Sequence, residues 1–389
     1  MENELRRTWA EVSLDALEHN YRTLRKHVGE QVKFLGVVKA DAYGHGSVQV
    51  SKLLQRLGAD YLAVSSIHEA MELRENGITM PLLILGHTPK DQVVNLIRYN
   101  ITQTVSCQAK ALNYSEEAVR LGATLKVHIK VDTGMSRLGF LCESDHFDEG
   151  VAGIVHACTL PGLAPEGIFT HFAVADEEDA ESQAYTQHQL DLFLRVIDAV
   201  QLQWGHTFAI RHCANTGATA LYPQAALDMV RPGLLLYGYS SLATQLGLHP
   251  AMTIKCAIQT IKHYPAGTKI SYGGTYTTTR PTRVGVLPYG YADGFLRALS
   301  NNCEVLTADG LVPQIGRICM DMCMVDLTDA PNVGVGDEVE VWGPNNPIER
   351  LAEAAGTIPY ELVCAVSKRV PRVYLQNGKE VFRELMLRM

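Results

Sequence analysis

The sequence predicts an α/β fold in which an N-terminal (β/α)8 barrel of the TIM type is followed by a mostly β C-terminal domain. Two observations carry this prediction. Before residue 240, eight short apolar runs alternate with stretches of helical character, and after about residue 245 short strands with turn residues replace them. We therefore expect two domains, residues 1–244 and residues 245–389.

Each apolar run of the first domain is a candidate strand that is apolar on both faces, as in a covered parallel sheet. The eight runs are residues 33–39, 60–66, 81–86, 101–106, 125–131, 166–171, 208–213 and 228–233. Helical stretches such as 14–28 and 47–58 separate them, which indicates parallel βαβ units. Eight such units in this length of chain fit a closed barrel better than an open sheet.

The second domain is expected to contain short strands separated by turns. The strands should fall within residues 252–264, 269–279, 283–291 and 334–343. The dipeptides Gly273–Gly274 and Pro331–Asn332 are typical turn signals.

Composition excludes several classes of function. A net charge of −8 without a block of like charges argues against a nucleic-acid-binding surface. No apolar run approaches the roughly 20 residues that span a bilayer, and the first twenty residues lack the apolar core of a secretory signal. The nine cysteines are scattered singly, and Cys319 and Cys323 have no second ligand pair near them, so we expect reduced thiols and no metal site. The expected location is the cytoplasm.

Residues 34–46, FLGVVKADAYGHG, place Lys39 at the end of a run that looks buried. One interpretation is that Lys39 marks the point where the strand reaches water. The other is a desolvated amine that can be neutral and nucleophilic.

Because the active site of such a barrel lies at the C-terminal ends of its strands, the residues at those ends are informative. The charged side chains there are Lys39, Lys130, Arg137, His171 and Arg231. Singly, each is compatible with a structural role, but together at one rim they favour a functional site.

The loops after the last two strands indicate an anion site. Asn215, Thr216 and Gly217 can open a helix whose N–H groups face an anion, and Gly233 lets the backbone approach a ligand closely. These are the loops that often bind phosphate in this fold, although a simple N-cap and a turn glycine remain the alternative. A phosphate site beside a strand-end lysine indicates pyridoxal phosphate, held covalently by that lysine.

Motifs along nearly the whole chain resemble those of bacterial alanine racemases, pyridoxal phosphate enzymes of fold type III. The motifs are, in order, VVKADAYGHG, KVDTGMSRLGF, FTHFAVAD, HCANTGA, MVRPGLLLYG, KISYGGTYT, GYADGF, GRICMDM and SKRVPR. The resemblance implies an isomerase that interconverts L- and D-alanine by two bases and supplies D-alanine for peptidoglycan.

The resemblance also implies roles for individual residues. Lys39 would bind the cofactor and act as one acid/base group, and Tyr272 would be the second, supplied by the neighbouring subunit of a homodimer. The other cofactor-binding residues would be Tyr43, His171, Asn215, Thr216, Arg231, Gly233, Leu234 and Tyr360. The substrate-binding residues would be Arg137, Met320, Asp321 and Tyr291, and Lys130 resembles a lysine that is often carbamylated.

The implied chemistry is physically consistent. Lysine and tyrosine both have unperturbed pKa values near 10, and cationic surroundings lower both. A chain of Arg231, His171 and Tyr272 would supply those surroundings. Arg231 at the pyridine nitrogen would leave that nitrogen unprotonated, which weakens the electron sink and limits transamination.

Other readings remain open at this point. A racemase for serine would share the cofactor motifs, and the entrance around Tyr291, Met320 and Tyr360 would distinguish it. A decarboxylase of the same cofactor fold would call for a carboxylate where Arg231 stands. A non-catalytic pyridoxal phosphate carrier would be a single barrel, and a metal-dependent barrel hydrolase would need ligand spacings that are missing from the strand ends.

Overall fold

The structure, a computed structural model, describes residues 7–385. The chain forms two compact units that do not divide at a single point of the sequence. One unit contains residues 21–42 and 47–236. The other contains the described residues up to Asn20, Tyr43–Gly46 and those from Tyr237 onward. Two helices, α1 (Leu14–Val28) and α2 (Lys39–Tyr43), therefore begin in one unit and end in the other.

The first unit is built on eight parallel strands, which confirms the expected barrel. They are β2 (Lys33–Val37), β3 (Tyr61–Val64), β4 (Leu82–Ile84), β5 (Thr102–Val105), β6 (Leu125–Asp132), β8 (Leu163–Phe169), β9 (Ile210–His212) and β10 (Met229–Val230). The short strands β3, β4 and β5 are buried along their whole length, as expected of a parallel sheet that is covered by helices. A two-residue strand, β7 (Phe140–Leu141), pairs beside β6.

Backbone hydrogen bonds bring the two ends of this sheet together. β10 pairs with β2, and the N–H groups of Asp228 and Arg231 donate to the carbonyls of Arg211 and Ala214 at 3.1 and 3.0 Å. The strands thus form a nearly closed ring, with their carboxyl ends at one rim.

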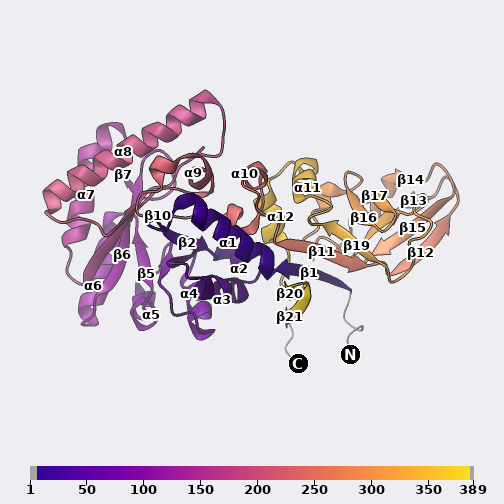
Figure 1. Ribbon diagram of the computed structural model, residues 1–389, viewed down its shortest axis with the longest axis horizontal. Helices are drawn as coiled ribbons and strands as arrows, with labels where there is room; N and C mark the ends of the chain where they lie inside the picture. Colours follow the sequence, from indigo (N-terminus) through magenta and orange to yellow (C-terminus); the bar gives the residue numbers. More distant parts are fainter. Residues whose placement is uncertain (1–6, 386–389) are drawn as a thin grey trace. The chain divides into compact units, whose positions relative to one another are not determined.

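Helices surround the strands of this unit (Figure 1). They are α3 (Ser47–Leu57), α4 (Ile67–Glu75), α5 (Val93–Arg98), α6 (Gln108–Arg120), α7 (Phe147–Thr159), α8 (Ala180–Trp204) and α9 (Thr216–Leu221). Their ends carry recognisable signals: Ser66 and Glu69 form a capping box at α4, Asp179 caps α8, and the left-handed Gly205 ends it. None of the helices in the described part of the chain is long and apolar enough to cross a membrane.

The second unit is mostly sheet, as expected. Its ten-stranded sheet has the order β12-β15-β18-β17-β16-β19-β11-β1-β20-β21. The strands are β1 (Thr8–Ser13), β11 (Met252–Ala257), β12 (Thr260–Tyr264), β15 (Thr282–Leu287), β16 (Glu304–Thr307), β17 (Gly310–Ile315), β18 (Cys323–Asp326), β19 (Glu338–Trp342), β20 (Arg372–Gln376) and β21 (Lys379–Glu384). In β11 buried and half-buried residues alternate, which is the pattern of an antiparallel strand with one covered face.

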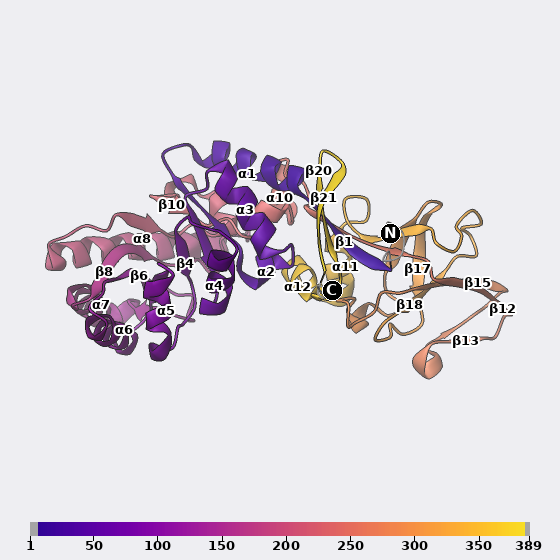
Figure 2. The same ribbon diagram turned by 90° about the horizontal axis from the view of Figure 1, so that it is seen from below.

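Shorter elements complete this unit. They are the hairpin strands β13 (Lys269–Ile270) and β14 (Tyr276–Thr277) and the helices α10 (Ser241–Gln245), α11 (Ile348–Ala355) and α12 (Pro359–Ala365). Figures 1 and 2 both show β13 beside β12 and β15, at one end of the unit.

The N-terminal strand belongs to this sheet. β1 pairs antiparallel with β11 and parallel with β20, so it lies between two strands that come more than 240 positions later. Such long-range pairing depends on tertiary structure and leaves no mark in the local periodicity of residues 8–13.

A buried arginine fixes the segment Tyr43–Gly46 in this unit. Arg372 is 3% exposed, and its Nε–H donates to the carbonyl of Gly44 at 3.0 Å. Its other N–H groups donate to the carbonyls of Val366, Ser367 and Val370 at 2.5–2.7 Å. The guanidinium therefore joins Gly44 to the segment 366–370 through four backbone carbonyls.

Two glycines allow this close approach. Gly44 and Gly46 have φ values of +80° and +89°, and a Cβ on Gly44 would lie 2.2 Å from the carbonyl oxygen of Val363. A Cβ on Gly46 would lie 1.7 Å from the hydroxyl oxygen of Tyr374. Larger residues at these positions would push the segment away from α12 and β20.

We expect Arg372→Lys to lower the free energy of unfolding by about 2–4 kcal/mol, because lysine leaves several buried carbonyls without a donor. The exposed Arg297→Lys is the matched control and should change stability by less than about 0.5 kcal/mol. Urea unfolding followed by circular dichroism measures both. Equal stability of the two variants would contradict this assignment.

Candidate active site at the barrel rim

Lys39 stands at the start of a left-handed turn. Ala40, Asp41, Ala42 and Tyr43 all have φ between 51° and 55°, so α2 is a single turn of left-handed helix. This conformation costs roughly 1–2 kcal/mol per residue with an L side chain, and it persists where the surroundings hold it in place. The turn redirects the chain immediately after the half-buried Lys39.

Two carboxylates hold this turn. Glu69 Oε1 accepts the N–H of Ala40 at 2.7 Å, and its Oε2 accepts the N–H of Ser65 at 2.6 Å. Asp41 Oδ1 accepts the N–H of Ser47, the first residue of α3, at 2.8 Å. The strain next to Lys39 is thus offset by charge-assisted hydrogen bonds that link the turn to two helix N-termini.

Arg231, which follows β10, is 4% exposed and makes four hydrogen bonds. Its Nη2 donates to the carbonyls of Thr170 and Cys213 at 2.9 and 3.1 Å and lies 3.3 Å from His171 Nδ1. Its Nη1 lies 2.9 Å from His212 Nδ1. Burial lowers its pKa to about 10, which still leaves the guanidinium charged at neutral pH.

Lys130 is buried beside this arginine. Its Nζ donates to the carbonyl of Val131 at 3.3 Å and lies 5.0 Å from the centre of the Phe169 ring. Burial, followed by the charge of Arg231, lowers the pKa of Lys130 well below its usual range. The neutral amine is therefore more populated at this position than in an exposed lysine.

The pKa of His171 is affected by all the charged side chains of this cluster. Burial lowers its pKa well below the usual range, and the charges of Arg231, Lys130, Arg137 and Lys39 lower it further, in that order. The structure thus brings these charged side chains from different strand ends within electrostatic reach of one imidazole. The neutral state of His171 leaves one ring nitrogen as an acceptor and the other as a donor.

The loops after β9 and β10 are joined by one hydroxyl. Thr216 Oγ1 accepts the N–H of Gly233 at 2.9 Å, and Asn215 caps the first turn of α9 through its side chain. A Cβ on Gly217 would lie 2.6 Å from the backbone nitrogen of Asp176, so only glycine fits there. Backbone N–H groups and hydroxyls are therefore concentrated at the rim where the sequence predicts a phosphate site.

The remaining predicted site residues lie in the second unit. They are Tyr43, Tyr272, Tyr291, Met320, Asp321 and Tyr360. The Tyr43 ring centre lies 5.2 Å from that of Tyr237 and 5.9 Å from that of Tyr360. Burial and the neighbouring Tyr360 raise the pKa of Tyr43, which keeps its phenol protonated.

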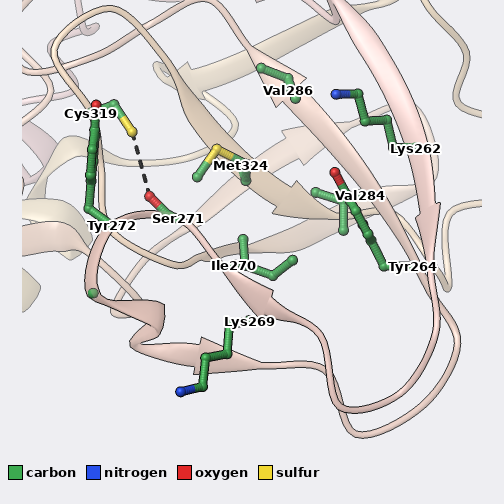
Figure 3. Close-up of a pocket in the computed structure, with 11 residues that line it drawn as sticks. Lys262, Tyr264, Lys269, Ile270, Ser271, Tyr272, Val284, Val286, Cys319 and Met324 are labelled. Carbon is green, nitrogen blue, oxygen red and sulfur yellow. Dashed lines mark hydrogen bonds between the residues drawn. The ribbon is translucent and has the colours of Figure 1, made fainter.

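Tyr272 is the most exposed of these residues, at 71%. It opens the short turn between β13 and β14 and borders a groove of about 640 Å³ (Figure 3). Ser271 beside it has φ +65°, donates its hydroxyl to the carbonyl of Arg317 at 2.6 Å and contacts Cys319 Sγ at 3.5 Å. The loop is thus well anchored while its tyrosine projects into open space.

Tyr291 and Met320 are also exposed, at 44% and 53%. Their two loops approach closely at Gly290, where a Cβ would lie 2.4 Å from the carbonyl oxygen of Met320. Asp321 Oδ1 accepts from Arg369 Nη2 at 2.8 Å, so its carboxylate is engaged in an ion pair. Tyr291 and Met320 thus present large side chains at the surface of the second unit, which leaves them partly uncovered.

Sequence analysis missed two histidines that extend the arginine cluster into the barrel. His212 contacts Arg231, and His128 Nδ1 lies 2.9 Å from His212 Nε2. A signal was present, because His128 lies two positions before Lys130 in β6, and alternate residues of a strand share a face. In the described part of the chain, no group of three or more His, Cys, Asp or Glu side chains is arranged to hold a metal ion.

Comparison with known proteins identifies the family. The model for "Alanine racemase, N-terminal domain" matches residues 12–241, and that for "Alanine racemase, C-terminal domain" matches residues 251–374. The alanine racemase of Desulforamulus reducens is 45% identical over 372 residues, which cover 94% of this chain and 98% of the relative.

Solved structures agree over the same length. An alanine racemase from Clostridium difficile 630 superposes with a TM-score of 0.93 at 41% identity, covering 99% of this chain and 100% of that one. Its complex with cycloserine superposes with a TM-score of 0.89 at 40% identity, covering 98% and 99%. Since two family models and full-length relatives match this chain over most of its length, it belongs to the alanine racemase family of isomerases.

Proposed function

We propose that this chain interconverts L- and D-alanine with pyridoxal phosphate as its cofactor, and that the D-alanine supplies peptidoglycan. The observation that carries the proposal is the cluster of Arg231, Arg137 and Lys39, with the buried Lys130, around one neutral histidine. The positive charge of the two arginines attracts an anionic ligand that has several acceptors. Lys39 at its edge provides the amine that would hold the cofactor covalently.

The residues of the rim fit pyridoxal phosphate. Asn215, Thr216, Gly233 and Leu234 present the backbone and hydroxyl groups that would bind its phosphate, and Tyr43 and Tyr360 would add phenols. The Nε–H of Arg231 makes none of the hydrogen bonds described for that side chain, so it is suited to the pyridine nitrogen. When bound, the cofactor supplies an electron sink for the charge left on the substrate Cα.

Lys39 Nζ and Tyr272 Oη would act as the two bases, one removing the Cα proton and the other returning a proton to the opposite face. His171 contacts Arg231 and would extend the network to Tyr272. Because Tyr272 is 71% exposed in its own chain, we propose that it completes the site of a second copy in a homodimer.

Substrate selection would depend on the cation of Arg137 and on the entrance formed by Tyr291, Met320 and Asp321. An arginine is suited to a substrate carboxylate because its guanidinium presents a planar pair of donors. Serine is the alternative substrate, since it differs from alanine only by one hydroxyl and would share every cofactor contact. Location in the cytoplasm is supported by the cysteines, all of which are free thiols.

Lys130 is proposed to be carbamylated. Its neutral amine can attack carbon dioxide, forming an N–C bond and releasing one proton to solvent. Burial next to Arg231 favours the neutral amine that this step needs, and Arg137 lies within electrostatic reach of the anion produced.

The first prediction concerns proton exchange. We expect wild-type protein with pyridoxal phosphate and L-alanine in D₂O to lose the Cα–H signal and to form D-alanine. Lys39→Ala should reduce both by roughly 10³-fold or more, because it removes the cofactor anchor and one base. Lys52→Ala, an exposed lysine of α3, is the matched control and should exchange normally. Bound cofactor without exchange in the wild type would favour the carrier, and faster exchange with L-serine would favour the serine racemase.

The second prediction concerns the shared site. Lys39→Ala and Tyr272→Phe should each be inactive alone, and a coexpressed mixture should recover about a quarter of the wild-type activity, because half of the dimers are mixed and each has one intact site. Tyr276→Phe in the same hairpin should remain active alone. A mixture of dimers without activity would place both bases in the same subunit.

The third prediction concerns Lys130. With ¹³C-labelled bicarbonate, the wild type should show a carbamate carbon resonance that disappears in Lys130→Arg, since a permanently charged guanidinium does not react. Lys126→Arg, an exposed lysine in the same strand, should keep the resonance. The same resonance in Lys130→Arg would exclude this modification.

A further inference from the structure

A row of polar side chains runs through the interior of the barrel, from Arg231 toward the opposite ends of the strands. Arg231 Nη1 lies 2.9 Å from His212 Nδ1, and His212 Nε2 lies 2.9 Å from His128 Nδ1. His128 Nε2 lies 3.6 Å from Glu166 Oε2, which accepts the hydroxyl of Tyr61 at 2.8 Å. The two imidazoles and the arginine are buried, and His128 and His212 are 0% exposed.

The chemistry of the donors gives this row a direction. A guanidinium only donates, so His212 Nδ1 must accept, and the proton of this imidazole is on Nε2. That N–H then donates to His128 Nδ1, which places the proton of His128 on its Nε2, facing Glu166. Burial lowers the pKa of both histidines, which agrees with two neutral rings.

Glu166 reaches this row because of a local irregularity in β8. Val127 pairs with Pro165 and His128 with Gly167, which leaves Glu166 as the extra residue of a bulge. A bulge redirects a side chain that a regular strand would point elsewhere. Gly167 leaves room for the imidazole, because a Cβ there would lie 2.6–2.8 Å from three atoms of the His128 ring.

The row also links the charge of Arg231 to an anion, which the direct hydrogen-bond partners of Arg231 do not provide. The hydrogen-bond partners described for Arg231 are two carbonyls and two imidazoles, with no carboxylate among them. A buried cation without an anion is costly. His128 and Tyr61 hold the pKa of Glu166 down, to about 2, so its carboxylate is ionised. In the described part of the chain, His128 Nε2 makes no hydrogen bond, so the carboxylate acts on this N–H across 3.6 Å.

We propose that Glu166 is a positioning residue for racemisation: acting through His128 and His212, it is the remote counter-charge of Arg231 and the acceptor that faces the last N–H of the row. This inference rests on the proposed role of Arg231 at the pyridine nitrogen. With Glu166 in place, each imidazole N–H of the row points away from Arg231 and toward an acceptor, and Arg231 keeps its Nε–H for the cofactor. Without the anion, the N–H of His128 loses its charged acceptor, and the row no longer ends in a counter-charge for Arg231.

The direct test is the protonation of the two imidazoles in the cofactor-free protein. Long-range ¹H–¹⁵N spectra of ¹⁵N-histidine protein should show neutral rings protonated on Nε2 for both His128 and His212, with assignments from His128→Gln and His212→Gln. A wild-type proton on Nδ1 of either ring overturns the proposal and requires no Glu166 variant.

Variants separate the charge from the shape of the side chain. In Glu166→Gln both rings should stay protonated on Nε2, because Arg231 still selects these tautomers, but the His128 N–H resonance should shift, because a neutral amide is a weaker acceptor than a carboxylate. Glu166→Asp keeps the charge and should shift this resonance less. Glu116→Gln on α6 removes an exposed carboxylate of the same unit and should change nothing. An unchanged His128 N–H resonance in Glu166→Gln would show that the carboxylate does not act on the row.

The loaded enzyme supplies a second readout. In Glu166→Gln we expect the ratio of transamination to racemisation to rise about tenfold, with a shifted absorption band of the bound cofactor and a KM for alanine within about twofold of the wild type. An unchanged ratio would overturn the link to Arg231 even if the His128 N–H resonance shifts. If the wild type binds the cofactor but does not racemise alanine, the proposed function fails, while the tautomer measurement still decides whether the row exists.

Discussion

The burial of one guanidinium is the constraint on which the rest of the barrel rim depends. Arg231 is charged and almost fully enclosed, so each of its donors needs an acceptor and its charge needs a distant or a close anion. The carbonyls of Thr170 and Cys213 and the two imidazoles supply the acceptors. Burial, and then this fixed positive charge, drive the neighbouring Lys130 and His171 toward their neutral forms, and these are the forms that can react or relay a proton.

The strained turn after Lys39 also helps to arrange the charged residues of the barrel rim. Four consecutive left-handed residues are unfavourable, and the carboxylates of Glu69 and Asp41 offset that cost through bonds to backbone N–H groups. The result is that the lysine leaves the strand at the rim while the chain turns away directly behind it. In the second unit, Arg372 fixes Gly44 through another set of carbonyl contacts, so both ends of this short segment are held by buried or half-buried charge.

The two bases of the proposed reaction have opposite environments in a single chain. Lys39 is half-buried among other cations, whereas Tyr272 projects from a well-anchored loop into open space. An aromatic side chain with this exposure, beside a groove lined by Ile270, Val284 and Val286, is suited to a surface that a second copy covers. In the proposed homodimer, the exposed Tyr272 of one copy would complete the charged rim of the other.

The amino-acid sequence by itself determined the strand and helix alternation, the parallel barrel, the mostly β second unit and the charged residues at the strand ends, because these depend on local periodicity and on short motifs. Only the tertiary structure decided that β1 joins the sheet of the second unit, since its partners lie more than 240 positions away. It also decided that Asp321 is engaged with Arg369, and that Glu166 leaves the regular pleat at a bulge. His128 and His212 can be located in the sequence, but their protonation depends on their contacts with Arg231 and Glu166. Such a row forms only when distant strands are brought together around one axis.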